Sequence, residues 1–129
     1  MIKRESKASV LFRHWVFANY KNLKTCSFEI KQTEGDSISF SALEEHQVNY
    51  SQAIKHGPKG TLTRVESGTI GAPDYIYLKE EPAFIVVKYP HLFAVIDIDK
   101  WETEKILNKR KSLTSADARR LALHVVDLK

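Results

Sequence analysis

Two apolar stretches decide the fold: AFIVVKY at residues 83–89 and LFAVIDI at residues 92–98, joined by Pro90-His91. Both are rich in β-branched and aromatic side chains, a composition typical of strands. Residues 84–87 are apolar without interruption, which predicts burial on both faces of the sheet. The link between the stretches is short enough for a hairpin. We therefore expect two paired strands at the centre of a sheet.

A further strand is expected at residues 74–79, with residues 80–82 as its link to the strand at residues 83–89. A short strand and a loop are expected at residues 61–72. Residues 25–33 alternate in polarity, as a strand with two different faces does. Helices are expected at residues 6–20, 43–55, 101–107 and 115–123, with Ser41 and Glu44 as a capping box before the second of them. The fold class is α/β (α+β), a mixed β-sheet flanked by helices.

Composition bounds the function classes. The chain has 129 residues, 43% of them hydrophobic and 28% charged, which fits a single globular domain over residues 1–129. No apolar run approaches the ~20 residues of a membrane helix, and the basic N-terminus lacks a signal-peptide pattern, so we expect a cytoplasmic protein without a membrane partner. Cys26 is the single cysteine, which excludes an internal disulfide and a cysteine-rich zinc site.

The net charge of +4 favours a polyanionic partner such as DNA. Basic residues cluster near both ends of the sequence, and for each cluster a solvated surface is the alternative interpretation. The clusters are Lys3, Arg4 and Lys7, then Lys109, Arg110 and Lys111, then Arg119 and Arg120.

The first candidate for chemistry is the sequence Phe28-Glu29-Ile30-Lys31. Glu29 and Lys31 are two apart on an expected strand, so both project from one face. A carboxylate can hold Mg²⁺ or Mn²⁺ beside a phosphodiester, and a lysine can orient water and offset charge in the transition state. The alternative is a surface ion pair, which is common in proteins.

A second stretch, residues 39–47, leads into the helix expected from residue 43 and ends in His46-Gln47. An E-x-K strand followed by a polar stretch and then His-Gln at a helix start resembles the RecU-type Holliday-junction resolvases of the PD-(D/E)XK nuclease superfamily. The apolar strands at residues 84–89 and 92–98 also resemble later strands of that family. The resemblance covers roughly residues 28–98.

The resemblance implies a restriction-endonuclease-like fold and Mg²⁺-dependent hydrolysis of DNA, most plausibly branched duplex DNA, by a homodimer. It implies that Glu29 and Asp74 hold the metal together with the Ile30 carbonyl. Lys31 then polarises the attacking water, and Gln47 helps to position it. A gene of phage or mobile-element origin is a further expectation.

One departure from the family pattern concerns its upstream aspartate, because no Asp precedes Asp36 in this chain. Asp74 is the proposed replacement, which requires residues 74–79 to pair beside residues 25–33. An ordinary Pro73-Asp74 turn is the alternative. A rival register puts Val86 in the acidic position, where it could not bind a metal, so Lys88 is assigned a structural or DNA-facing role. Glu5 is a further acidic candidate.

Other residues are expected to have structural roles. Phe12, Trp15 and Phe17 are expected in the core, and Trp101 is expected to anchor a helix against the sheet. Asp97 and Asp99 suit a helix start, with a second metal site as the alternative. Two other functions remain open: a nucleic-acid-binding module without catalysis, and a protein-interaction domain.

Overall fold

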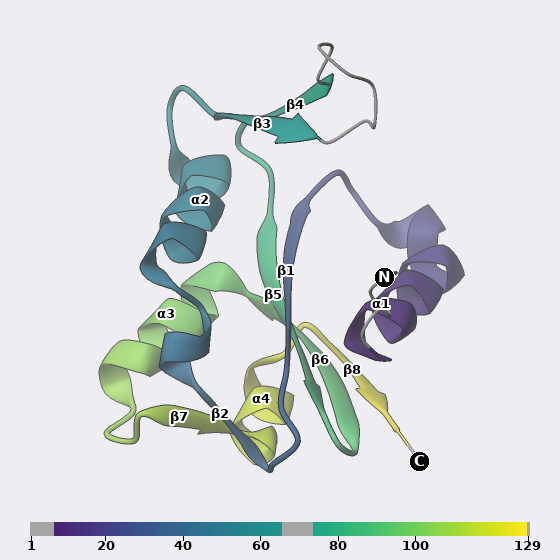
Figure 1. The fold of residues 1–129 in the computed structure, drawn as a ribbon, viewed down its shortest axis with the longest axis vertical. Coiled ribbons are helices and arrows are strands. Elements are labelled where there is room, and N and C mark those ends of the chain that lie inside the picture. The colour runs from purple at the N-terminus through teal and green to yellow at the C-terminus, as the bar shows by residue number, and fades with distance from the viewer. Residues whose placement is uncertain (1–6, 66–73, 129) are drawn as a thin grey trace, which may run out of the picture.

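The computed structural model describes residues 7–65 and 74–128. Helices and strands are interleaved along the chain (Figure 1). Their bounds are α1 Lys7–Asn19, η1 Tyr20–Asn22, β1 Ser27–Gln32, β2 Ser37–Ser39, η2 Phe40–Ala42, α2 Glu45–His56, β3 Thr61–Val65, β4 Asp74–Leu78, β5 Ala83–Tyr89, β6 Leu92–Asp97, α3 Ile98–Leu107, β7 Ser112–Thr114, α4 Ser115–Leu121 and β8 His124–Asp127.

The central sheet has the strand order β1-β5-β6-β8. β5 and β6 form the expected antiparallel hairpin, with Val86 opposite Val95. β1 runs parallel to β5, with Glu29 opposite Ile85 and Lys31 opposite Val87. The prediction of a mixed sheet flanked by helices is therefore confirmed.

Helices cover both faces of this sheet, as the continuous apolar run in β5 predicts. α1 lies on one side and α2, α3 and α4 lie on the other (Figure 1). The larger core contains Ile85, Val87 and Trp101, all fully buried, and packs under α2, α3 and α4. The smaller core contains Val86 and packs against Trp15 of α1. Trp101 anchors α3 as expected.

Two short antiparallel pairs lie outside the central sheet. β2 pairs with β7, and β3 pairs with β4, with Val65 opposite Asp74. The prediction that residues 80–82 form a hairpin link to β5 is wrong. Glu80 adopts a left-handed backbone conformation with φ 54°, and the chain leaves the β3–β4 hairpin there to enter the central sheet.

Local sequence accounts for the helix starts. The capping box of α2 is formed by Glu44 and Gln47 and not by the predicted Ser41 and Glu44, because the chain first makes the short helix η2. Asp97 caps α3 by accepting from the Asp99 backbone N–H at 2.8 Å, as predicted. Phe17 is 73% exposed, so its assignment to the core is wrong. No helix in the described ranges is long and apolar enough to cross a membrane.

Candidate active site

Glu29 and Lys31 project from β1 toward α2, on the face of the sheet that carries the larger core. The Lys31 Nζ lies 3.6 Å from the Glu29 Oε1, and the two side chains are 21% and 33% exposed respectively. The prediction that these residues share a face is confirmed. A distance of 3.6 Å is an ion-pair contact but longer than a hydrogen bond, so neither group is saturated by the other.

Gln47 joins the pair from the first turn of α2. Its Nε2 donates a hydrogen bond of 2.8 Å to the Glu29 Oε1. Its Oε1 accepts from the Glu44 backbone N–H at 3.0 Å, which is the capping-box contact. Because the amide oxygen is occupied by a backbone donor, the amide nitrogen is the atom turned toward Glu29. The start of the helix and the orientation of the carboxylate are thus set by one side chain.

The Ile30 carbonyl faces the open edge of β1. The backbone N–H groups of Ser27 and Thr33 donate to β5 and its flanks, at Pro82 and Lys88. Alternate residues of a strand direct their backbone groups to opposite sides, so those of Ile30 point away from β5. In the described part of the chain β1 has β5 as its single sheet neighbour. This carbonyl is therefore not used in the β1–β5 ladder.

Asp74 does not occupy the position that the sequence predicted. Its strand, β4, pairs with β3 in a separate two-stranded sheet, and the neighbour of β1 is β5. The Asp74 side chain is exposed at the start of β4, opposite Val65. The predicted pairing of residues 74–79 beside residues 25–33 is wrong, because the Thr61–Val65 segment competes for β4 and lies closer along the chain.

Glu5, the further acidic candidate from the sequence, lies outside the described residues, as does Pro73 before Asp74. Glu45 is exposed on α2. Within residues 7–65 and 74–128, no group of three or more His, Cys, Asp and Glu side chains is arranged to hold a metal ion. In this part of the chain, Glu29 is the carboxylate around which Lys31 and Gln47 gather.

A second charged cluster joins the last turn of α2 to the start of α3. Lys55 Nζ lies 2.8 Å from Asp97 Oδ1 and 2.5 Å from Asp99 Oδ2. Gln52 and His56 also contact Asp99, at 3.2 and 3.0 Å. Sequence reasoning missed the three α2 residues, although their spacing of three and four puts them on one helix face.

Hydrogen bonding sets the protonation of this second cluster. Partial burial raises the pKa of Asp99, but hydrogen bonds from Lys55, His56 and Gln52 outweigh it and hold that pKa below its ordinary value. Partial burial lowers the pKa of Lys55, and the hydrogen bonds and charges of Asp97 and Asp99 reverse this, so the Lys55 pKa is raised. The cluster is a closed ion-pair network at neutral pH.

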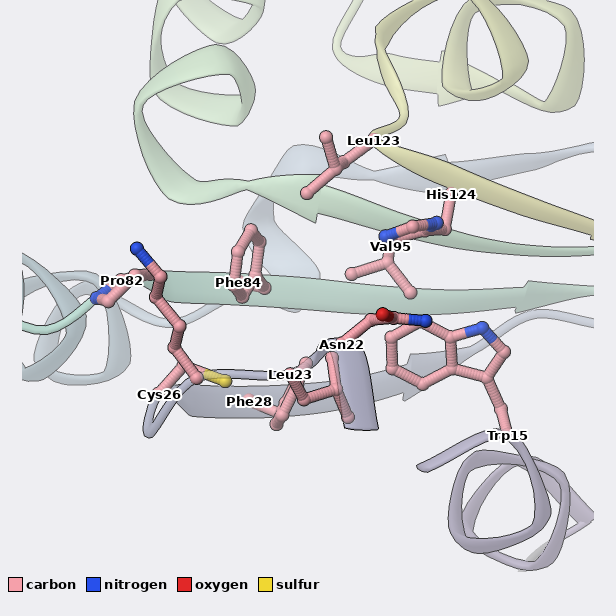
Figure 2. A pocket seen from close by; sticks show the side chains of 11 residues that line it. Trp15, Asn22, Leu23, Cys26, Phe28, Pro82, Phe84, Val95, Leu123 and His124 are labelled. Atoms are coloured by element: carbon pink, nitrogen blue, oxygen red, sulfur yellow. The ribbon is translucent and has the colours of Figure 1, made fainter. Parts of the chain in front are cut away.

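An apolar hollow of about 180 Å³ lies on the α1 side of the sheet (Figure 2). Trp15, Phe28 and Phe84 line it together with Cys26. Burial, and to a smaller extent the charge of Glu81, raises the pKa of the Cys26 thiol. Cys26 is therefore held as a neutral thiol, which is a poor nucleophile.

Comparisons with protein-family models, with curated proteins and with solved structures gave no match to this chain. The resemblance to RecU-type resolvases rests on the residues quoted from the sequence.

Proposed function

We propose that this protein is a metal-dependent DNA endonuclease whose active site is built on Glu29, Lys31 and Gln47. The observation that carries the proposal is the convergence of these three side chains. They come from β1 and α2; Glu29 and Gln47 are 18 residues apart in the chain, and the Gln47 amide reaches Glu29 at 2.8 Å. A carboxylate whose Oε2 has no hydrogen-bond partner among the described residues, a neighbouring ammonium group and an orienting amide suit hydrolysis of a phosphodiester.

The described residues fit Mg²⁺ or Mn²⁺ when substrate oxygens complete the coordination. Glu29 and the Ile30 carbonyl offer hard oxygen ligands, and Mg²⁺ in phosphoryl-transfer sites commonly uses one or two carboxylates plus waters and phosphate oxygens. When bound, the metal supplies an activated water and neutralises charge on the phosphate. Asp74 has no place in this set unless β4 approaches β1.

The chain's own side chains have separate roles in the proposed site. Gln47 orients the Glu29 carboxylate, since it contacts that group directly, and so acts as a positioning residue. Lys31 lies within reach of the same carboxylate and can donate to the water or to a phosphate oxygen as negative charge develops. Branched DNA as substrate and a two-fold dimer follow from the resemblance and from the need to cut two symmetric strands.

To test the proposal, the purified protein is incubated with labelled branched and linear duplex DNA, with and without Mg²⁺, and cleavage is measured. We expect cutting that requires the metal and that Glu29→Gln abolishes, because the nearly isosteric amide lacks the charge a hard cation requires. Thermal melts of the variant check that the fold is intact. Equal cutting by Glu29→Gln and the wild-type chain would remove Glu29 from the mechanism.

A second candidate is a nucleic-acid-binding module without catalysis. The single carboxylate at the site, within the described residues, favours it. It predicts salt-sensitive DNA binding with no metal-dependent cutting by the wild-type chain. The absence of binding at low salt would instead favour a protein-interaction domain.

A further inference from the structure

A basic hollow lies between η2 and the loop that joins α3 to β7. Four cationic side chains line it, together with two serines whose hydroxyls are hydrogen-bonded to each other at 2.7 Å. These residues are Lys105, Lys109, Arg110, Lys111, Ser39 and Ser41. The hollow has a volume of about 350 Å³, roughly the share of ten water molecules in the liquid, so it admits more than a single small ion.

The walls of the hollow are held in place by the fold. The Phe40 backbone N–H donates to the Lys111 carbonyl at 3.0 Å, and β2 pairs with β7 directly beside it, with Ser39 opposite Ser112. Phe40 is buried and packs edge-on against Trp101, with ring centroids 5.1 Å apart. The basic loop is thereby fixed to the segment that carries the serines.

No carboxylate from residues 7–65 and 74–128 compensates the charge of the hollow. All four cationic side chains are exposed, and none forms an ion pair with a carboxylate within the described ranges. No acidic side chain from those ranges lines the hollow. The C-terminal end of α3 carries a partial negative charge that favours nearby cations, which accounts for Lys105 in its last turn. Lys109, Arg110 and Lys111 lie beyond that turn, and gathering them has a Coulombic cost.

We infer that this hollow binds the phosphodiester backbone of the DNA strand that the Glu29 site cuts, so the inference rests on the proposed function. Lysine and arginine side chains with serine hydroxyls are the usual partners of backbone phosphates. η2 continues through Leu43 and Glu44 into α2, whose Gln47 contacts Glu29, so one continuous segment connects the hollow to the active site. The contact positions the strand and carries no sequence preference.

The experiment measures DNA binding as a function of salt for Glu29→Gln protein and for two triple variants in that background. The first is Lys109→Gln, Arg110→Gln and Lys111→Gln. The control, Lys21→Gln, Lys59→Gln and Lys79→Gln, removes the same charge from exposed side chains elsewhere. We expect the log–log salt slope to flatten by about 0.9 per lost phosphate contact on duplex DNA in the first variant and much less in the control.

Equal slopes for the two triple variants would overturn the inference, because only net charge would then matter. An unchanged slope in the first variant would do the same. Cleavage by protein with an intact Glu29 separates the two proposals. Cutting by the wild-type chain, with unaltered slopes in the triple variants, rejects the hollow alone. A flattened slope in the first triple variant, with no cutting by the wild-type chain, rejects the nuclease alone. The absence of any DNA binding rejects both.

Discussion

The two ends of α2 carry charged clusters that differ in how fully their groups are satisfied. At the last turn, Lys55 lies within 2.9 Å of oxygens on both Asp97 and Asp99. At the first turn, Lys31 lies 3.6 Å from Glu29, and among the described residues Gln47 makes the one short contact to that carboxylate. A charged group whose hydrogen-bonding capacity is already used by neighbouring residues binds a ligand less readily. The difference therefore separates a cluster that stabilises the helix packing from one that can bind.

The hydrogen bonds of the two clusters point the same way. The last-turn cluster sets two carboxylates around one lysine and one histidine, and each carboxylate accepts hydrogen bonds from cationic or backbone donors. The first-turn cluster has one carboxylate and one lysine, both partly exposed. A metal ion and a phosphate would add one cation and one anion to the first cluster without displacing an existing bond. A cation that entered the second cluster would compete with Lys55 for both carboxylates.

The two clusters should differ most when the lysine of each is replaced. We expect Lys31→Met to lower the cleavage rate by about 10²- to 10³-fold, the effect of losing one preorganised charge donor, with the melting temperature unchanged. Lys55→Met should do the reverse: it removes the cation shared by Asp97 and Asp99 and lowers the free energy of unfolding by up to about 1 kcal/mol. Single-turnover cleavage and chemical denaturation measure the two effects. The assignment fails if Lys55→Met is the variant that loses chemistry while staying folded.

Gln47→Met tests whether the amide acts through Glu29. A hydrogen bond to a charged group contributes about 1.5–3 kcal/mol, which corresponds to roughly 10- to 100-fold in rate if it is made in the transition state. The change also removes the capping-box contact to the Glu44 N–H, so a loss of about 1 kcal/mol in stability is expected. The matched control is Gln52→Met, which removes one contact to Asp99 and should leave the rate unchanged. A fall in rate with a weakened apparent Mg²⁺ affinity identifies positioning of the carboxylate.

Asp99→Asn tests the ion pairs of the last-turn cluster through the pH dependence of the free energy of unfolding. The folded-state pKa of Asp99 lies below its ordinary value, so its ionisation stabilises the fold above about pH 4 and this contribution is lost as the pH falls through the folded value. The raised pKa of Lys55 acts in the opposite sense. Its contribution is present below about pH 10.4 and is lost as the pH rises through the folded value.

The wild-type chain should therefore exceed Asp99→Asn in stability by roughly 1 kcal/mol on a plateau between about pH 5 and pH 9. The difference should shrink toward both ends of that range. Urea titrations at a series of pH values measure it, and a difference that stays constant below pH 4 would contradict the ion-pair assignment.

The smallest expected effect belongs to Asp74→Asn. Because β4 pairs with β3 and not with β1, this exposed carboxylate has no contact with the Glu29 cluster within the described residues. We expect the cleavage rate and its Mg²⁺ dependence to match those of the wild-type chain, in contrast to Glu29→Gln. A loss as severe as that of Glu29→Gln would show that the β3–β4 hairpin reaches the active site when DNA is bound.

Local patterns predicted the parts of the molecule that depend on local physics. The apolar runs of β5 and β6 leave few alternatives to buried strands, and the spacing of Glu29 and Lys31 fixes a shared face. The choice of strand partners is different, because it depends on which edges compete in three dimensions. Nothing local in residues 74–79 distinguishes pairing with β3 from pairing with β1.

Local sequence patterns also could not predict the shortest strands or the contacts between residues far apart in the chain. β2 and β7 are each three residues long, too short for a periodicity to register. Phe17 lies two residues after Trp15, which is about 200° around the helix, so it is on the face of α1 turned away from the sheet. The contacts of Lys55 depend on carboxylates more than 40 residues away. Such pairs become visible only when the helices are placed.

Because α2 is held by contacts at both ends, keeping both sets of contacts depends more on the length of the helix than on most of its surface residues. Gln47 and Lys55 are separated by about 12 Å of helix at 1.5 Å per residue. A single inserted or deleted residue between them would rotate one end against the other by about 100°. With Lys55 held by Asp97 and Asp99, that rotation would carry Gln47 away from Glu29. Homologous chains should accordingly vary in the amino acids on the outer face of this helix while keeping the number of residues between its two contacts constant.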